Sequence, residues 1–292
     1  MTDFAGSVFL TGAAVTLAAA VVVFVASWAV SQRIGRVSIV DVTWGLGFVA
    51  IAATAYLWTL DDGGNTTRRV LVLVLTAVWG LRLAGYIAMR NHGKGEDPRY
   101  DAMLSRARGS RARFALTNVF LLQAGIAWFV SMPVQVAMAE RSEPNALAWI
   151  GTAVWAVGVF FEAVGDAQLA AFKRDPANRG KVMDRGLWRY TRHPNYFGDA
   201  CLWTGLWLVA AQQWPGLVTV LSPVAMGYFL AFKTGKPLLE KSMSKRPGYD
   251  NYVRRTSGFF PLPPKAGQTA EPPKAGQVAE PTEQSTEATA KS

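Results

Sequence analysis

The sequence predicts an all-α, polytopic membrane protein with seven transmembrane helices, and three observations lead to this fold class. Hydrophobic residues make up 51% of the 292 positions, and the mean hydropathy is positive at +0.16. The apolar residues fall into long runs, and Lys and Arg gather in the gaps between them. An ordinary soluble domain is less apolar than this, so lipid is the expected solvent for most of the chain.

A bilayer core of about 30 Å requires roughly 20 apolar residues per helix, because lipid cannot satisfy exposed backbone polar groups. The first run is longer than the core of a signal peptide and follows Asp3 rather than a basic segment, so we expect a retained span. Only residues 212–215 separate the last two runs, which predicts a tight helical hairpin. The seven runs lie near residues 6–30, 39–60, 69–90, 114–138, 146–171, 196–213 and 215–232.

The basic residues predict the orientation of these helices. The segments 90–113, 173–192 and 233–255 each contain seven Lys and Arg residues, whereas the loops at 61–68 and 139–145 contain acids that roughly cancel their few Arg. The positive-inside rule then places the N-terminus outside and the C-terminus in the cytoplasm, in the cell (inner) membrane. The net charge of +10 is assigned to anionic lipid headgroups rather than to nucleic acid.

Two further features bound the organisation of the chain. Residues 1–261 form one membrane domain, and residues 262–292 are rich in Pro, Ala, Glu, Lys and Thr, which predicts a disordered tail. The single cysteine, Cys201, excludes a disulfide or a thiolate metal cluster within one chain. Two histidines without clustered carboxylates also argue against a metal site.

Ionisable side chains inside a span are costly, so they are candidates for function. Glu162 and Asp166 share one face of the fifth span, and Arg82, Tyr86 and Arg90 recur every four residues in the third. An ion pair between these two spans is expected. The alternative is a purely structural buried pair that fixes the helix register.

The second span begins with Asp41 at the same cytoplasmic level. Gly45 and Gly47 follow, and the run 45–50 fits the pattern G-x-G-x-x-A. No strand precedes this run, so we interpret the glycines as sites of close helix packing rather than as a dinucleotide-binding fingerprint.

The densest polar segment is 181–199, and it leads directly into the sixth span. Its arginines can donate to phosphate or carboxylate groups, which predicts a loop that holds a polar ligand. After the seventh span, residues 247–261 form an amphipathic segment that is expected either to fold back under the bundle or to anchor at the interface. The candidate ligand-binding side chains are Tyr190, Arg192, His193 and Tyr196 in the segment 181–199, and Lys236 and Glu240 between the seventh span and residue 247.

Four segments together resemble an uncharacterised bacterial membrane family that is itself similar to the C-terminal domain of steroid 5α-reductases. They are DVTWGLGF at 41–48, LRLAGYIAMRNHGKGEDPRY at 81–100, GLWRYTRHPNYFGD at 186–199 and LLEKSMSKRPGYDNYVRRTSGFFP at 238–261. The resemblance covers nearly everything except the tail.

This resemblance implies a seven-helix bundle that binds NADPH near the cytoplasmic side and reduces a carbon–carbon double bond of a steroid or similar lipid. Asp166 matches a cofactor-binding aspartate, and Lys173 stands where the family has an arginine for the phosphates. Tyr190 and Asn195 match a tyrosine and an asparagine that contact the cofactor. The other matches are Asp199, where the family has a glutamate, and Asn91 with Lys94, which resemble its N-x-G-R segment.

The sequence departs from the reductase pattern at the catalytic positions. The family's catalytic tyrosine lies three residues before the third-span arginine, where this chain has Trp79. Tyr86, one turn later and backed by Asp41, is the expected catalytic pair. The residues expected to bind the cofactor are Arg82, Arg90, Asn91, Lys94, Glu162, Asp166, Lys173, Tyr190, Arg192, His193, Asn195, Tyr196, Asp199, Lys236 and Glu240.

The motif R-H-P-x-Y-x-G keeps two other functions open. Isoprenylcysteine carboxyl methyltransferases and phospholipid methyltransferases share it, and they bind S-adenosylmethionine. In that alternative the segment 192–198 and Glu240 would hold S-adenosylmethionine. A non-catalytic lipid-binding protein is the third possibility. A hydrophobic small molecule or a lipid is the expected substrate or ligand in each case.

Overall fold

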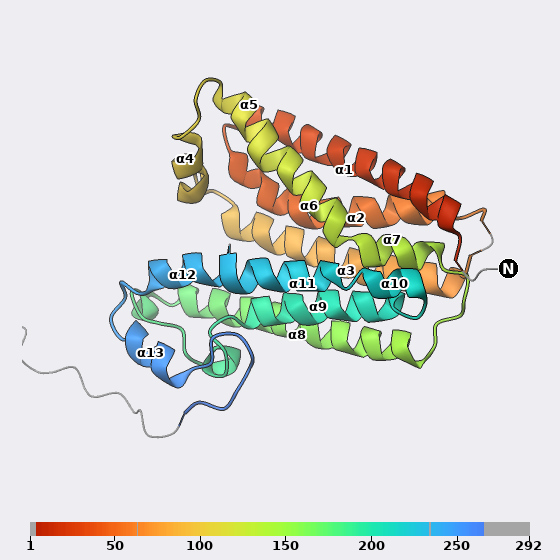
Figure 1. Ribbon diagram of the computed structural model, residues 1–292. Helices are drawn as coiled ribbons and strands as arrows, with labels where there is room; N and C mark the ends of the chain where they lie inside the picture. Colours follow the sequence, from red (N-terminus) through yellow and green to blue (C-terminus); the bar gives the residue numbers. More distant parts are fainter. Residues whose placement is uncertain (1–3, 63, 234, 266–292) are drawn as a thin grey trace, which may run out of the picture.

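The computed structural model describes residues 4–62, 64–233 and 235–265, and over these ranges its regular secondary structure is helical (Figure 1). Within this part of the chain, two isolated bridges, Phe4 with Glu140 and Thr191 with Ser257, are the only β-type pairings. The all-α fold class is therefore confirmed. The tail expected to be disordered lies outside the described residues from position 266 onward.

Long helices run side by side, and shorter ones join and cap them (Figure 1). The segments η2 and η5 are π-helical, and η1, η3 and η4 are 3₁₀-helical. In chain order the elements are α1 (Gly6–Ile34), η1 (Val37–Ile39), α2 (Val40–Trp58), α3 (Thr66–Asn91), α4 (Pro98–Leu104), α5 (Arg111–Ala115), η2 (Leu116–Leu121), α6 (Leu122–Val130), α7 (Met132–Ala139), α8 (Ala146–Arg174), η3 (Pro176–Asn178), η4 (Gly186–Arg189), α9 (Pro194–Ala210), α10 (Trp214–Val218), α11 (Leu221–Tyr228), η5 (Phe229–Lys233), α12 (Lys236–Met243) and α13 (Tyr249–Arg255).

Six helical segments in the described part of the chain are long and apolar enough to cross a membrane, which indicates a multi-pass membrane protein. The sixth run expected from the sequence corresponds to α9, which has 17 residues and is shorter than these six. The count of seven spans therefore stays a prediction. The six segments are Gly6–Ile34, Val37–Trp58, Thr66–Asn91, Arg111–Val130, Ala146–Arg174 and Trp214–Phe232.

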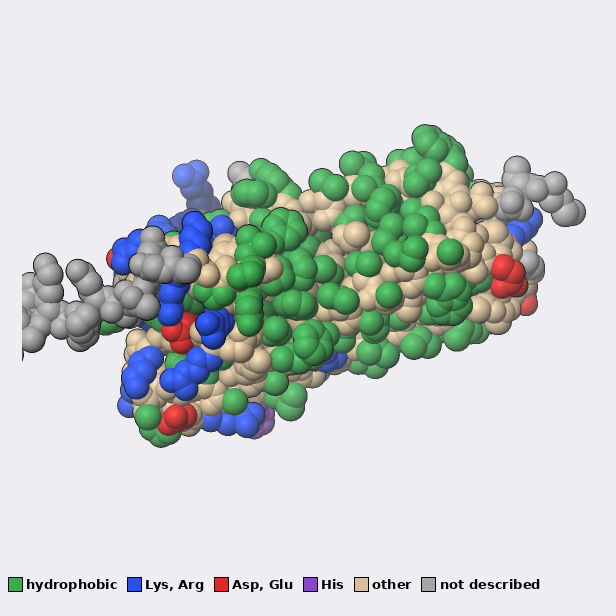
Figure 2. Space-filling model, turned by 90° about the horizontal axis from the view of Figure 1, so that it is seen from below, with side chains coloured by type: hydrophobic (Ala, Val, Ile, Leu, Met, Phe, Trp, Pro, Cys, Tyr) green, Lys and Arg blue, Asp and Glu red, His purple; other side chains and the backbone are tan. Residues whose placement is uncertain are grey.

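Charge is distributed unevenly along the bundle. Figure 2 shows hydrophobic side chains along its length and Lys and Arg gathered at one end. This end, which carries α4, α12 and α13 in Figure 1, is called the basic end below. The start of α1 lies at the opposite end of the bundle.

Local sequence explains where the spans begin and break. The side chain of Asn145 accepts hydrogen bonds from the backbone N–H groups of Leu147 and Ala148 and so caps the start of α8. The fourth run was expected to be one helix over 114–138, but a turn at Ser131 separates α6 from α7. Pro133 follows within the first turn of α7, where its missing N–H costs no helical hydrogen bond.

Glycines allow two helix pairs to pack backbone against backbone. A Cβ on Gly158 of α8 would lie 2.6 Å from the carbonyl oxygen of Gly198 on α9, and a Cβ on Gly151 would lie 2.6 Å from that of Gly205. Gly45 of α2 meets α3 in the same way, which confirms the packing role predicted for it. The α8–α9 contact is the most extensive in the fold, and it brings polar residues of both helices together.

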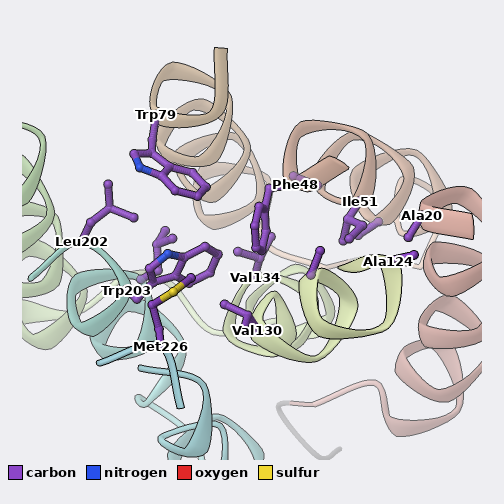
Figure 3. Packing of buried hydrophobic residues seen from close by; sticks show 14 of the residues in the cluster. Ala20, Phe48, Ile51, Trp79, Ala124, Val130, Val134, Leu202, Trp203 and Met226 are labelled. Carbon is purple, nitrogen blue, oxygen red and sulfur yellow. The ribbon is translucent and has the colours of Figure 1, made fainter. Parts of the chain in front are cut away.

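Aromatic side chains from three helices fill the centre of the bundle (Figure 3). Trp79 of α3 and Trp203 of α9 are fully buried and meet edge to face, with ring centroids 5.3 Å apart. Phe48 of α2 lies against both, at 5.3 Å from Trp79 and 4.7 Å from Trp203. This cluster fixes the relative positions of α2, α3 and α9.

A buried arginine joins several loops at the opposite end. Arg68 has no exposed surface, and its Nη1 lies 3.0 Å from the Oε2 atom of the equally buried Glu140. The same guanidinium donates to the carbonyl oxygen of Val209 at 2.6 Å and to the side chain of Gln212 at 2.6 Å. Arg68 therefore ties the start of α3 to the loops after α7 and α9.

Candidate functional site

Arg82 of α3 lies between two carboxylates of α8. Its Nη1 donates to Asp166 Oδ2 at 3.0 Å, and its Nη2 pairs with Glu162 Oε2. The side chains of Glu162 and Asp166 are 3% and 8% exposed, so the charge of Arg82 offsets carboxylates that are almost removed from solvent. The expected ion pair between the third and fifth spans is confirmed.

Helix α9 completes this carboxylate cluster. Asn195 donates to Asp166 Oδ1 at 2.6 Å, and the carboxyl group of Asp199 lies close to that of Glu162. Trp79, which stands where the reductase pattern has a tyrosine, donates its indole N–H to Glu162 Oε1 at 3.1 Å. The glycine contacts between α8 and α9 make this approach possible, because they leave no side chain between the two backbones.

Three buried polar atoms of the cluster have no hydrogen-bond partner among the described residues. They are Arg82 Nε, Asn195 Oδ1 and Asp199 Oδ1. Buried polar atoms are nearly always paired, because an unpaired one loses its hydrogen bonds to water without replacement. The cluster therefore has one open donor and two open acceptors for a polar ligand or for water.

Tyr86 and Arg90 continue the same face of α3 toward the basic end. Tyr86 is half-buried, and its hydroxyl makes no hydrogen bond within the described residues. The guanidinium of Arg90 lies 5.9 Å from the centre of the Tyr86 ring. Asp166 and Arg82 are close enough to act electrostatically on the phenol. Tyr86 thus offers a free hydroxyl beside the carboxylate cluster.

Cations gather just beyond this point. Lys173, near the end of α8, faces the positive charges of Arg90, Lys94 and Arg246. Asp166 is the carboxylate that attracts Lys173, and Asp166 is already paired with Arg82. Each of these three cations repels Lys173, so this cation group favours an anionic ligand.

Asp41 has partners that were not foreseen. Its Oδ1 accepts a hydrogen bond from the Tyr100 hydroxyl at 2.5 Å, and its Oδ2 lies 3.2 Å from Arg99. Burial, followed by the negative charge of Asp41, raises the pKa of Tyr100 well above its usual range. Within the described residues no hydrogen bond joins Asp41 to Tyr86, so the expected pairing of these two residues is not seen.

Tyr100 and Arg99 were missed because the segment 90–113 reads as a basic loop. The local pattern does contain a helix start: Asp97 accepts from the Arg99 backbone N–H at 2.9 Å, and Pro98 occupies the first helical position of α4. That start could have predicted the helix. It could not have predicted that the helix carries Tyr100 to α2.

A second polar cluster joins the loop before α9 to α12. Arg192 Nε donates to Glu240 Oε1 at 2.9 Å, and His193 Nε2 lies 3.1 Å from the same oxygen. Burial lowers the pKa of His193, although Glu240 acts against this effect. Although burial alone would raise the pKa of Glu240, hydrogen bonds from Arg192 and His193 hold it below its usual value, and the charge of Lys236 adds to this effect.

Tyr196 lies between the two clusters. Its ring stacks on His193 with centroids 5.2 Å apart and planes within 8°, and it is close to the charges of Asp199, Arg99 and Arg90. The first two turns of α9 thus carry Asn195 and Asp199 toward the carboxylate cluster while His193, just before the helix, contacts α12.

The C-terminal segment clamps the loop that precedes α9. The hydroxyl of Tyr252 donates to the carbonyl oxygen of Trp188 at 2.6 Å, and the hydroxyl of Thr191 donates to that of Phe259 at 2.8 Å. The backbone N–H of Arg192 donates to the carbonyl oxygen of Ser257 at 2.9 Å. Helix α13 therefore folds back under the bundle and fixes the loop.

Two of the expected cofactor residues join neither the two polar clusters nor the cation group. Tyr190 is 43% exposed, and its carbonyl oxygen accepts from the backbone N–H of Leu262. The side chain of Asn91 accepts from Arg90, and its carbonyl oxygen accepts from Arg36 at 3.3 Å. Asn91 therefore ties the end of α3 to the connection between α1 and α2.

The model of a family described as a protein of unknown function, DUF1295, matches residues 27–256. The chain belongs to the DUF1295 family. The matched range contains both polar clusters and the cation group, and it ends just after α13. DUF1295 is a steroid 5α-reductase-like family, which agrees with the resemblance found in the sequence motifs.

The chain is similar to two further proteins, and the name of one of them suggests an activity. An uncharacterized protein from Schizosaccharomyces pombe is 23% identical over 261 residues, which is 80% of this chain and 75% of that protein. A probable O-methyltransferase from Ustilaginoidea virens is 32% identical over 100 residues, or 34% of each chain. This DUF1295 chain thus spans only about a third of the methyltransferase. No solved structure matches the chain significantly.

Proposed function

We propose that this DUF1295 protein is a membrane-embedded, NADPH-dependent reductase of a carbon–carbon double bond in a steroid-like or other lipid. The observation that carries the proposal is the cation group beside the carboxylate cluster, in which Arg90, Lys94 and Arg246 each repel Lys173. A ligand with several phosphate charges would relieve this repulsion. S-adenosylmethionine has no phosphate and would not.

The residues present fit the rest of such a cofactor. The cation group would hold the phosphates, since Arg pairs with phosphate through two parallel hydrogen bonds. The open Nε of Arg82 and the open oxygens of Asn195 and Asp199 would pair with polar groups of the nucleotide. The carboxylate of Asp166 would accept hydrogen bonds from donor groups of the nucleotide.

When bound, NADPH supplies the hydride. The chain's own part is to polarise the conjugated carbonyl group of the substrate and to provide a proton, and we assign this part to Tyr86. Its hydroxyl is free among the described residues, whereas the Tyr100 hydroxyl is already donated to Asp41. Arg82, held by Glu162 and Asp166, fixes the polar wall beside Tyr86.

The Lys and Arg residues of the basic end also indicate how the protein is oriented in the membrane. We infer that the basic end faces the cytoplasm, because Lys and Arg are retained on that side of the cell membrane. The start of α1 and helix α13 lie at opposite ends of the bundle, which supports an odd number of crossings. Helix α9 would then be the seventh span.

Ligand titration tests the function. Adding NADPH to the purified protein should quench tryptophan fluorescence, and S-adenosylmethionine should not. Lys173→Gln should weaken NADPH binding roughly tenfold, because it removes one charged hydrogen-bond donor. Arg174→Gln is the matched control, since it removes the same charge at the next residue and should leave binding unchanged within about twofold. Equal losses in both variants would reject the site.

A methyltransferase is the second candidate, and the relative from Ustilaginoidea virens favours it. In this alternative the cluster of Arg192, His193 and Glu240 would hold the methionyl part of S-adenosylmethionine. Quenching by S-adenosylmethionine together with no response to NADPH would establish this alternative over the reductase.

A further inference from the structure

An apolar groove opens to the membrane between α6 and α11. Its volume is about 320 Å³, and every residue along it is apolar. Leu122, Gly125 and Phe129 form the wall on α6, and Ala225 and Phe229 form the wall opposite. Both walls belong to segments that are long and apolar enough to span a membrane, so the medium outside the groove is hydrocarbon.

The dimensions of the groove suit one extended chain. Its wall from Leu121 to Val130 covers about 14 Å of helix at 1.5 Å per residue. A groove of about 320 Å³ over that length has room for one extended hydrocarbon chain, whereas a partner helix, about 10 Å across, is too large to enter it.

Both walls of the groove lead to polar residues of the candidate site. On α6, the side chain of Gln123, next to Leu122, lies close to that of Tyr100. On the other wall, Phe229 begins η5, and a Cβ on Gly235, just before α12, would lie 3.0 Å from the ring of Tyr196. Arg99 is close to both Tyr100 and Tyr196. A lipid in the groove would thus have polar partners at the basic end.

The backbone beside the groove is irregular on both sides. The π-helical segment η2 ends at Leu121, where the groove begins, and the π-helical segment η5 starts at Phe229 on the opposite wall. π-Helical turns are rare and are found frequently at functional sites, because they displace side chains from the regular helical face. Gly125 adds space, since a Cβ there would meet no atom within 4 Å.

We propose that this groove holds the hydrocarbon chain of the substrate, a single-chain or isoprenoid lipid whose polar end reaches Tyr100, Arg99 and Tyr196. The inference rests on the proposed function and narrows its substrate class from lipids in general to those with an extended chain. The apolar walls bind the chain, and the polar residues at the basic end select the head of the lipid.

Photolabelling tests the proposal. The full-length protein is reconstituted in phosphatidylcholine vesicles with hexadecanol that carries a diazirine in mid-chain, and the labelled residues are mapped by mass spectrometry. Labelling of Leu122 and Phe129 should saturate, whereas labelling of the membrane-exposed residues Val157 and Phe160 of α8 should rise in proportion to the probe. Gly125→Leu should lower the groove labelling about tenfold by filling the volume.

Two controls separate the substrate from bulk lipid. Gly227→Leu adds the same side chain on α11, at another open position outside the groove lining, and should leave the labelling within about twofold. Tyr100→Phe removes a hydroxyl at the basic end and should weaken labelling of the groove, because the head of the probe binds there. Labelling that does not saturate, or that is unchanged in either Gly125→Leu or Tyr100→Phe, would overturn the proposal. If the groove behaves as expected but NADPH does not bind, the groove assignment stands and the reductase is rejected.

Discussion

Asp166 is the residue at which structural and binding roles can be separated. Its carboxylate bonds to Arg82 and Asn195, but Arg82 keeps a second partner in Glu162. Glu162 is more deeply buried and contacts Arg82, Trp79 and Asp199. The two carboxylates therefore differ in how much of the fold depends on each of them.

Asp166→Asn should weaken NADPH binding about tenfold or more and change the melting temperature little, because one charged hydrogen bond to the ligand is lost while Arg82 stays paired. The comparison variant is Glu162→Gln, which should lower the melting temperature because a buried ion pair is broken. Fluorescence titration and thermal melting in detergent measure both effects. An equally large loss of thermal stability in Asp166→Asn would show that the pair with Arg82 is structural.

The sequence predicted which residues carry charge in the spans, but not all of their partners. A spacing of four residues places Glu162 and Asp166 on one face, and a buried positive charge must find a carboxylate, so Arg82 was predictable. The partner of Asp41 was not, because it comes from the short helix α4 in a loop without hydrophobic periodicity. The spacing of residues along the sequence does not predict contacts that depend on how a loop folds back.

Helix packing decides how close the polar residues of α8 and α9 lie. The glycines of α8 at 151, 158 and 165 recur every seven residues, and those of α9 at 198 and 205 have the same spacing. Gly151 meets Gly205 and Gly158 meets Gly198, which gives two helices in contact through their backbones. The length of α9 was overestimated at its end, because the apolar residues continue past Ala210 while the helix stops there.

Gly158→Ala should separate α8 from α9 and destabilise the fold by about 1–3 kcal/mol, because the added methyl would lie 2.6 Å from a backbone oxygen that cannot rotate away. Gly85→Ala is the control, since a Cβ there meets nothing within 4 Å and should be neutral or stabilise the helix by up to about 1 kcal/mol. Thermal melting in detergent compares the two. Equal melting temperatures would mean that the close approach of these helices contributes nothing to stability.

The two ends of the molecule should respond to pH in opposite directions. At the basic end the pKa values of His193 and Glu240 are both lowered, so the unfolded chain binds more protons and stability is lost as the pH falls below about 6.5. At the opposite end burial outweighs the attraction of Arg68 and raises the pKa of Glu140 to about 7. There the folded protein binds the extra proton, so stability is lost as the pH rises from 4.5 to about 7.

Glu140→Gln isolates the second of these effects. The wild-type protein should lose on the order of 3 kcal/mol through Glu140 over that range, because a shift of one pKa unit corresponds to about 1.4 kcal/mol. In Glu140→Gln this loss should disappear. The pH dependence that remains should come from His193 and Glu240 and have the opposite sign. Melting temperatures measured in steps from pH 5 to pH 8 reveal the difference. The control is Glu143→Gln, which changes an exposed carboxylate three residues away and should keep the wild-type dependence of the melting temperature on pH. If Glu140→Gln shows that same wild-type dependence, Glu140 does not take up this proton.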